Sequence, residues 1–501
     1  MVTHEGVPLS TLAESAGDLL IDLRDPADTE VHGVAYDSRK VASGDLFFCI
    51  PGTVTDGHDY AEVAVGSGAS ALCVERVLDL DIPQVVVSEV RRAMPRMAAR
   101  FFGDPADALT IIGITGTNGK TTTAFLLEAI LRADGRTTGL IGTIETRIGG
   151  EVQPGVRTTP ESLDLQELFA RMRDRGVDAL AMEVTSHALV LHRVDDVRFA
   201  AVGFTNLSQD HLDFHSSMED YFAAKTSLFL PERAATGAIN VDDPYGRRLM
   251  GSAPIECIGF GMSEDADVRA TAVKLEPSGT TLSVVTPRGD FEVATRLVGH
   301  FNVSNCLAAT ALALQAGIGL DAIIAGLGAT APVPGRFESV DGGQPFSVIV
   351  DYAHTPDSLD NVLSAARPLA DANGGRVICA FGCGGDRDRG KRPLMGAVVA
   401  RMADIVVVTS DNPRSEDPEA IIGAIIEGVI SVRTEGPDAT LADRGEAIRW
   451  ALEQATPGDV VVIAGKGHET GQEFKDRTIP FDDRIVAREG LARLGYKEAS
   501  A

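Results

Sequence analysis

Residues 109–134 read LTIIGITGTNGKTTTAFLLEAILRAD, and this stretch decides the fold class. A β-rich run from Leu109 to Thr115 enters a glycine-rich turn, and a helical pattern follows from Lys120 to Asp134. Strand, loop and helix in this order are typical of a phosphate-binding α/β unit, because loop N–H groups and a helix N-terminus attract anions. The sequence therefore predicts a phosphate site after a buried parallel strand.

The loop itself supplies the residues expected to bind a nucleotide. These residues are Gly116, Thr117, Asn118, Gly119, Lys120, Thr121 and Thr122. Lys120 is expected to balance phosphate charge, and the Thr121 hydroxyl to hold magnesium. The strict P-loop spacing is missed, since a glycine five positions before Gly119 would fall at Ile114. The alternative is a glycine-rich turn without a ligand, but Gly-Lys-Thr after a β run favours phosphate binding.

The segments around this unit indicate a doubly wound α/β domain. Strands of the buried type are expected at Ala179 to Val184 and Ala200 to Thr205, and a helix is expected at Leu163 to Arg175. Together they predict a mostly parallel sheet with helices on both faces. Residues 268–298 instead alternate apolar and polar side chains around Pro277-Ser-Gly279 and Pro287-Arg-Gly289. An antiparallel edge is therefore expected on the central sheet.

The length of 501 residues suggests about three domains. Short apolar runs within residues 1–88 indicate a small α/β domain, and a helical pattern from Arg91 to Phe102 ends at a Gly-Asp-Pro stop signal. A Pro/Gly linker, Ala331-Pro-Val-Pro-Gly335, precedes further strands. We therefore expect a small α/β domain at 1–88, a central phosphate-binding domain at 89–331 and a third, Rossmann-like doubly wound domain at 332–501.

Composition excludes several function classes. The chain has 72 acidic and 45 basic residues and a formal charge of -27, which disfavours binding to nucleic acid or to anionic membranes. The N-terminus lacks a basic segment followed by an apolar stretch, and no apolar run approaches the ~20 residues that cross a bilayer. Six scattered cysteines fit reduced thiols. A cytoplasmic enzyme is expected.

Several further polar residues lie where they could bind a metal ion or a phosphate group. Glu183 follows a strand, so it should emerge at the carboxyl edge of the sheet, where an oxygen ligand can hold magnesium. The cluster Asp210-His211-Leu-Asp-Phe-His215 contains only two soft ligands and no cysteine, so magnesium is favoured over zinc. Lys225 fits a solvated helix lysine on spacing alone. Arg336 could stabilise a transferring phosphoryl group or form a linker salt bridge.

The blocks above resemble the Mur ligase family, including its folylpolyglutamate synthase relatives. The resemblance spans nearly the whole chain and follows the order of the family. Its blocks are Gly116-Thr-Asn-Gly-Lys-Thr-Thr122, Met182-Glu-Val-Thr-Ser-His187, Asn206-Leu-Ser-Gln-Asp-His-Leu-Asp-Phe-His215, Ala223-Ala-Lys225, Gly299-His-Phe-Asn-Val-Ser-Asn305, Pro334-Gly-Arg-Phe-Glu338 and Asp351-Tyr-Ala-His-Thr-Pro356.

The resemblance implies roles that spacing cannot give. His211 would contribute to a second magnesium site. Lys225 would be carbamylated and so become an anionic ligand that helps to hold magnesium. The residues expected to contact ATP beyond the loop are Asn302, Asn305, Arg336, Asp351 and His354.

Substrate contacts are implied in the same way. The N-terminal blocks Asp37-Ser-Arg-Lys40 and Pro51-Gly-Thr-Val-Thr-Asp-Gly-His58 resemble a uridine-nucleotide domain, with Ser38 on the UDP part. Leu191 departs from members that carry glutamine in the substrate site. The muramoyl dipeptide would be held by Thr158, Thr159, Thr185 and Arg193. The incoming amino acid would be held by Arg387, Asp411, Asn412, Pro413, Arg414, Gly465 and Glu469.

Arg414 separates the possible amino acids. Its planar fork suits the distal carboxylate of meso-diaminopimelate, which lysine lacks. The resemblance thus implies an ATP- and magnesium-dependent ligase of peptidoglycan precursor synthesis, which extends UDP-N-acetylmuramoyl-L-alanyl-D-glutamate through an acyl phosphate and acts as a monomer without nucleic acid or membrane partners. The alternatives are a lysine-adding ligase, folylpolyglutamate synthase and a non-catalytic P-loop switch.

Overall fold

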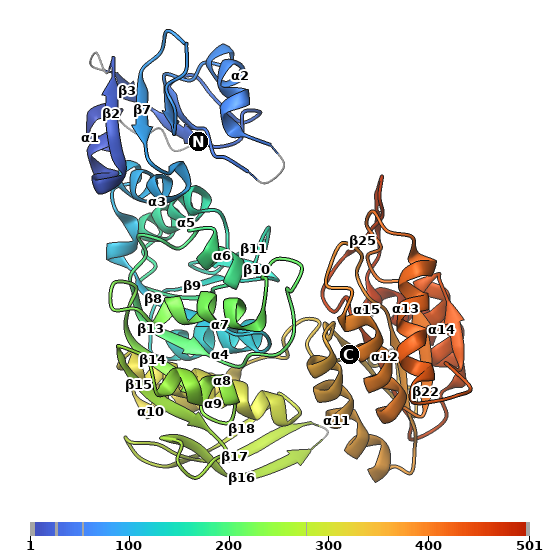
Figure 1. Cartoon of the computed structure of the whole chain (residues 1–501). Coiled ribbons are helices and arrows are strands. Elements are labelled where there is room, and N and C mark those ends of the chain that lie inside the picture. Colours follow the sequence, from blue (N-terminus) through green and yellow to red (C-terminus); the bar gives the residue numbers. More distant parts are fainter. Residues whose placement is uncertain (1–5, 26–28, 53–54, 277, 497–501) are drawn as a thin grey trace.

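The computed structural model describes residues 6–25, 29–52, 55–276 and 278–496. Three bodies follow one another along the chain, and their colours in Figure 1 run from blue through green and yellow to orange and red. Thr53 and Val54 of the N-terminal block and Pro277 of the expected turn lie outside the described residues.

The central domain is built on an 11-stranded sheet. The strands from β9 to β16 pair in parallel, whereas antiparallel pairs occur at both ends of the sheet. The expected mostly parallel sheet with an antiparallel edge is confirmed. In spatial order the strands are β11 (Glu151–Pro154), β10 (Glu145–Ile148), β9 (Thr138–Ile141), β12 (Ala179–Glu183), β8 (Thr110–Thr115), β13 (Phe199–Phe204), β14 (Ala234–Asn240), β15 (Glu256–Gly261), β16 (Val268–Glu276), β17 (Gly279–Val285) and β18 (Phe291–Thr295).

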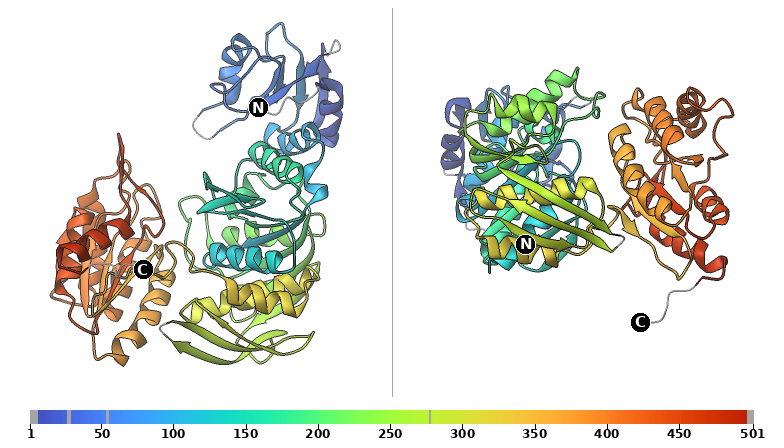
Figure 2. Two further views of the ribbon diagram at one scale, coloured as in Figure 1. Left: turned by 180° about the vertical axis from the view of Figure 1, so that it is seen from behind. Right: turned by 90° about the horizontal axis from the view of Figure 1, so that it is seen from below.

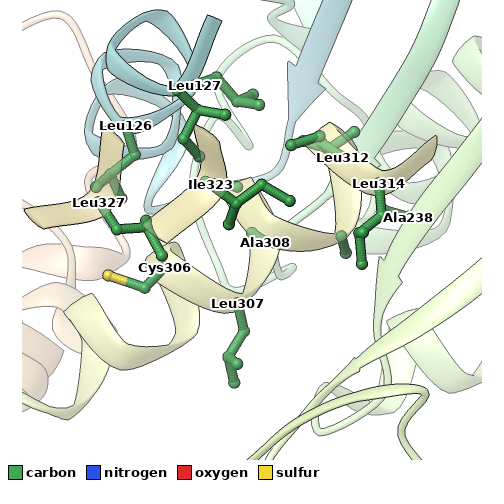
Figure 3. Packing of buried hydrophobic residues seen from close by; sticks show 14 of the residues in the cluster. Leu126, Leu127, Ala238, Cys306, Leu307, Ala308, Leu312, Leu314, Ile323 and Leu327 are labelled. Atoms are coloured by element: carbon green, nitrogen blue, oxygen red, sulfur yellow. The ribbon is translucent and has the colours of Figure 1, made fainter. Parts of the chain in front are cut away.

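Helices cover both faces of this sheet because its strands alternate their buried side chains. Ile112 and Ile114 of β8 belong to one apolar cluster, and Ile111 belongs to the cluster on the other face. Figure 3 shows Leu126 and Leu127 on the first of these faces. The helices on that face are α4 (Lys120–Ala133), α9 (His300–Gln315) and α10 (Leu320–Ala329). Those on the other face are α5 (Ser162–Asp174), α6 (Ser186–Val190), α7 (Met218–Thr226) and α8 (Pro244–Met250).

The N-terminal domain contains a 5-stranded sheet and a 2-stranded ladder of β1 with β3. Helix α3, although it follows the expected boundary at residue 88, packs into the same apolar cluster as Phe48 and Leu12. Its elements are β1 (Val7–Pro8), α1 (Leu9–Ser15), β2 (Leu20–Arg24), β3 (Glu30–Val31), β4 (Gly33–Ala35), β5 (Asp45–Phe48), α2 (Ala61–Gly66), β6 (Ala71–Val74), β7 (Gln84–Val87) and α3 (Val90–Phe101).

The C-terminal domain holds a 6-stranded sheet and the separate hairpin β25–β26. Strands β24, β21 and β22 are parallel neighbours, so the loops after their carboxyl ends lie at one edge of the sheet. Its elements are β19 (Glu338–Ser339), β20 (Ser347–Asp351), α11 (Pro356–Ala372), β21 (Val377–Phe381), α12 (Lys391–Met402), β22 (Ile405–Thr409), α13 (Pro418–Ile430), β23 (Ala439–Leu441), α14 (Arg444–Gln454), β24 (Val460–Ala464), β25 (Gly471–Glu473), β26 (Thr478–Pro480) and α15 (Asp483–Arg493).

The C-terminal domain lies beside the central domain, as Figures 1 and 2 show from several sides. Several polar contacts join them. Among these, the Asn118 side chain donates to Asp357 Oδ2 at 2.7 Å, Gln209 Nε2 donates to Asp388 Oδ2 at 3.1 Å, and Lys391 Nζ lies 3.2 Å from Asp210 Oδ1. Within the described ranges, no helix is both long and apolar enough to cross a membrane.

Candidate active site

The phosphate loop joins β8 to α4 and needs glycine at two points. Gly116 and Gly119 have φ values of 146° and 88°. A Cβ on Gly116 would lie 1.9 Å from Thr205 Oγ1, and one on Gly119 would lie 2.4 Å from Asn305 Oδ1. The backbone can therefore turn tightly at the N-terminus of α4, where N–H groups of the first turn lack intrahelical acceptors.

Lys120 folds back over this loop. Its ammonium donates to the carbonyl oxygens of Gly116 and Thr117 at 3.0 Å and 2.8 Å. Burial lowers the pKa of Lys120, while Glu183 and Asp210 oppose that shift. The group thus stands over the loop where a phosphate would need a counter-charge.

Glu183 is the centre of a buried network at the end of β12. Thr121 Oγ1 lies 3.0 Å from each of its carboxylate oxygens. Thr143 donates its backbone N–H to Oε1 at 2.8 Å and its hydroxyl to Oε2 at 3.1 Å. Arg336 reaches this network from the linker, with Nη2 at 3.3 Å from Thr121 Oγ1 and its guanidinium 4.3 Å from the centre of the Tyr352 ring. Glu183, Thr121 and Arg336 therefore lie in one network.

The residues expected to hold the dipeptide lie next to this network. The Thr158 and Thr143 hydroxyls are 3.0 Å apart. Thr159 Oγ1 donates to the carbonyl oxygen of Glu183 at 2.9 Å and accepts from Thr185 N at 3.1 Å. Arg193 donates to the Thr159 carbonyl oxygen at 3.2 Å. The loop after β11 and the segments that flank α6 thus bring all four predicted residues together.

Asp210 and His211 form the side of the site that faces the C-terminal domain. His211 has a φ of 56°, and its Nε2 lies 3.5 Å from Asp210 Oδ2. Burial lowers the pKa of His211 to about 3, so the ring is neutral at physiological pH. His354 Nε2 lies 3.7 Å from the same carboxylate oxygen. Hydrogen bonding and nearby cations hold the pKa of Asp210 well below its usual range despite its burial.

Lys225 is buried behind the loop rather than exposed on its helix. Its Nζ donates to the Gly116 carbonyl oxygen at 2.8 Å and lies 4.5 Å from the centre of the Tyr221 ring. Burial first, and the charge of Lys120 second, hold the pKa of Lys225 well below its usual range. The solvated-lysine alternative is therefore wrong.

The remaining residues expected near ATP divide into two groups. Asn305, Asp351 and His354 line the same cavity as the loop. Asn302 lies behind Asn305 and accepts its side-chain N–H at 2.9 Å. The Asp351 carboxylate accepts backbone N–H groups from Phe337 and Ala353 at 2.6 Å and 2.7 Å, so it fixes the end of the linker.

Two cavities run through this part of the molecule. The inner cavity, of about 670 Å³, is lined by the loop, Glu183, Thr158 and Arg336. The outer cavity, of about 880 Å³, lies between the N-terminal and central domains and is lined by Ser38. Arg157 lines both. The arrangement suits one long substrate that reaches from the first domain to the phosphate loop.

The residues expected to hold the amino acid form a separate cluster at the carboxyl edge of the C-terminal sheet. Glu469 accepts from the Asn412 side chain at 2.8 Å, and a Cβ on Gly465 would lie 2.5 Å from Asp411 Oδ2. Arg414 Nε donates to Glu473 Oε2 at 2.8 Å. Figure 1 shows the hairpin labelled β25 at this edge. None of the predicted amino-acid residues lines the inner cavity.

Comparisons with known proteins follow the same three-part division. Residues 30–100, 114–313 and 335–467 match the domain families described as "Mur ligase family, catalytic domain", "Mur ligase middle domain" and "Mur ligase, glutamate ligase domain". The chain belongs to the Mur ligase family. It is 49% identical over 475 residues to UDP-N-acetylmuramoyl-L-alanyl-D-glutamate--2,6-diaminopimelate ligase of Geobacillus kaustophilus, covering 93% of this chain and 96% of the relative.

Two further Mur ligases of the same name resemble the chain over its length. The protein from Streptomyces coelicolor is 47% identical over 502 residues, covering 98% of each chain. A solved structure of a ligase of this name has a TM-score of 0.68 at 32% identity and covers 98% of this chain and 100% of its own.

Sequence reasoning missed several residues of this Mur ligase site. Thr143 follows β9, so the argument that found Glu183 at the end of β12 could have found it. Lys391 and Lys466 are buried lysines beside acidic side chains, and Lys466 directly follows Gly465, which the sequence had already singled out. Glu161 lies within 4 Å of Arg157 and Arg193, a cluster that the sequence alone did not indicate. Leu191 caps the end of α6.

Proposed function

We propose that this chain adds meso-diaminopimelate to the D-glutamyl γ-carboxylate of UDP-N-acetylmuramoyl-L-alanyl-D-glutamate with hydrolysis of ATP to ADP and phosphate. The observation that carries the proposal is the meeting of the two cavities at Arg157, in a chain that resembles ligases of that activity from end to end. A uridine nucleotide in the outer cavity would place its peptide beside the phosphate loop, and Ser38 would contact the nucleotide.

The chemistry proceeds in two steps. The γ-carboxylate attacks the terminal phosphorus of ATP, the bond to the β-phosphate oxygen breaks, and an acyl phosphate and ADP result. The neutral amino group of diaminopimelate then attacks the acyl carbon, phosphate leaves, and the nitrogen loses a proton. The loop N–H groups, Lys120 and Arg336 supply the positive charge that both steps need. Thr158, Thr159, Thr185 and Arg193 hold the acceptor carboxylate in reach.

Magnesium fits the oxygen donors at the loop. Thr121 and Glu183 offer hard hydroxyl and carboxylate oxygens. In the described part of the chain, no group of three or more His, Cys, Asp or Glu side chains is arranged to hold a metal. A magnesium ion at Thr121 and Glu183 would take its other ligands from phosphate oxygens and water. A bound magnesium ion would neutralise charge on the transferring phosphate. His211 is proposed as a ligand of a second ion.

Lys225 is proposed to be carbamylated. A buried lysine with a lowered pKa offers a neutral amine, which adds to carbon dioxide with loss of a proton and becomes an anionic carbamate. That anion would lie beside Lys120, the neighbour whose charge now disfavours protonated Lys225. The modification would therefore replace repulsion by attraction behind the loop.

The C-terminal cluster is proposed to bind diaminopimelate. Asp411 and Glu469 suit an ammonium group, and Arg387 and Arg414 suit a carboxylate. Because this cluster does not line the inner cavity, the amino acid would be presented to the acyl phosphate by movement of the C-terminal domain. A cytoplasmic location and a monomeric state stay predictions.

The test is a panel of amino acids supplied with the UDP-muramoyl dipeptide and ATP. We expect phosphate release and peptide extension with meso-diaminopimelate, with lysine far less efficient. Efficient use of lysine and not diaminopimelate would favour the lysine-adding alternative. Phosphate release that needs neither dipeptide nor amino acid would instead favour a P-loop switch.

A further inference from the structure

We propose that Lys466 positions the amino-acid pocket: its buried ammonium joins Asn412 to Glu469 and thereby determines which carboxylate oxygen of Glu469 is presented to the amino acid. The proposal rests on the proposed function, because it concerns the same pocket. Lys466 follows β24, whereas Asn412 follows β22. One side chain thus connects loops from two strands that are separated by β21.

Polar partners surround the buried Lys466 side chain. Its side chain is fully buried, and Nζ lies 2.8 Å from Asn412 Oδ1 and 2.7 Å from Glu469 Oε2. Asp411 Oδ1 is farther away, at 3.9 Å. A buried ammonium is strongly unfavourable unless it is paired and hydrogen-bonded, so these contacts hold the two loops in one arrangement.

The two carboxylate oxygens of Glu469 differ in their hydrogen bonds. Oε2 accepts from both Lys466 and the Asn412 side chain, the latter at 2.8 Å. Among the described residues no hydrogen bond goes to Oε1, and the Glu469 side chain is 29% exposed. Oε1 is therefore the oxygen available to an ammonium group of the amino acid.

Asn412 is committed to the same network. Its Oδ1 accepts from Lys466 and from the backbone N–H of Glu473 at 3.0 Å, while its Nδ2 donates to Glu469. Asn412 therefore acts with Lys466 to orient Glu469. The contact to Glu473 extends the network to the hairpin whose carboxylate holds Arg414, so Lys466 also connects the two ends of the pocket.

The experiment uses the full chain with Lys466→Met, which keeps the length of the side chain and removes its charge. We expect the KM for diaminopimelate to rise roughly ten- to a hundredfold, the loss of one charge-assisted contact. The KM values for ATP and the UDP-dipeptide should stay within about twofold, because neither site contains Lys466. The matched control is Lys475→Met, an exposed lysine near the same hairpin, which should behave like the parent.

A second measurement separates positioning from a merely structural role. If Lys466 acts through Glu469, then Lys466→Met should change the KM for diaminopimelate less than about threefold when it is introduced into Glu469→Gln. Independent, additive effects of the two substitutions would overturn the proposal. Should Lys466→Met fail to fold, as judged by ADP binding and thermal unfolding, Lys466→Gln allows the same comparison.

Failure of this inference can be told from failure of the proposed function. A parent enzyme that does not use diaminopimelate removes the proposed function. A parent that uses it, with an unchanged KM in the folded Lys466→Met enzyme, removes only the role of Lys466. An equal rise in the KM for all three substrates would also contradict the proposal, since that result indicates general loosening.

Discussion

The Lys120 ammonium donates to two carbonyl oxygens of the phosphate loop, those of Gly116 and Thr117. We expect Lys120→Ala to reduce turnover by roughly a hundred- to a thousandfold or more, because it removes a charge aimed at the transferring phosphate. The fold should persist, since Lys120 begins a helix rather than filling a core. The measurement is phosphate release beside a thermal unfolding curve.

The control for that substitution is Lys274→Ala, an exposed lysine on β16 that pairs with Glu276. Its activity should match the parent. Near-normal ligation by Lys120→Ala would remove the P-loop role assigned to this residue.

Lys225 offers a second test at the scale of single residues. Lys225→Ala should be nearly inactive, and added formate or acetate should partly restore activity by occupying the vacated anionic position. Lys225→Arg is the matched variant: it keeps a cation, cannot be carbamylated and should not respond to carboxylic acids. The measurement is the ligation rate of each variant as a function of the concentration of added formate or acetate. A fully active enzyme whose intact mass shows unmodified Lys225 would contradict the hypothesis.

Among the elements, the hairpin β25–β26 orients Arg414. The Arg414 backbone N–H donates to the Glu473 carbonyl oxygen at 3.0 Å, and its Nη1 donates to the Gly385 carbonyl oxygen at 2.9 Å. Its φ of 51° lies in the left-handed region, so the loop holds an uncommon conformation at this residue. The guanidinium is therefore fixed on one side before any ligand arrives.

We expect Arg414→Ala to lower the efficiency with diaminopimelate about ten- to a hundredfold and to narrow its preference over lysine. ATP and the UDP-dipeptide should bind as before. The measurement is the ratio of kcat/KM for the two amino acids, with Arg477→Ala, on the same hairpin, as control. An unchanged ratio would mean that Arg414 does not read the distal carboxylate.

The sequence predicted those helices and strands whose apolar pattern is clear and whose ends carry turn residues. The strand at Ala179–Glu183 and the helix after the loop follow from continuous apolar runs and helical spacing. The hairpin of β10 and β11 was not predicted because half of residues 145–154 carry charged or polar side chains, so the segment shows no apolar run. The burial of Lys225 could not be read from its helix, since that depends on packing against the phosphate loop.

For the whole molecule, the sequence indicated three domains but not how they meet. The contact of Lys391 with Asp210 joins residues 181 positions apart, and no local pattern records such a pairing. Both side chains are buried, and Lys391 begins α12 while Asp210 precedes His211. This ion pair therefore connects the C-terminal domain to the candidate active site.

Lys391→Met should loosen that arrangement, because it removes the lysine partner of a buried carboxylate and leaves Asp210 with the weaker contacts to His211 and His354. We expect a larger radius of gyration by small-angle X-ray scattering in the absence of substrates, and a smaller kcat. Lys274→Met is the exposed control. An unchanged scattering profile would show that the other interdomain contacts suffice.

Gly335 and Gly467 lie in close backbone contact, and this contact affects how the two loops that carry them can move. A Cβ on Gly467 would lie 2.7 Å from the Gly335 carbonyl oxygen, and one on Gly335 would lie 2.1 Å from His468 N. The linker that carries Arg336 and the loop that carries Glu469 therefore touch through bare backbone, so a shift of one is expected to move the other. If nucleotide and amino acid bind at these two places as proposed, their binding is linked: whatever factor ATP imposes on the affinity for the amino acid, the amino acid imposes on the affinity for ATP.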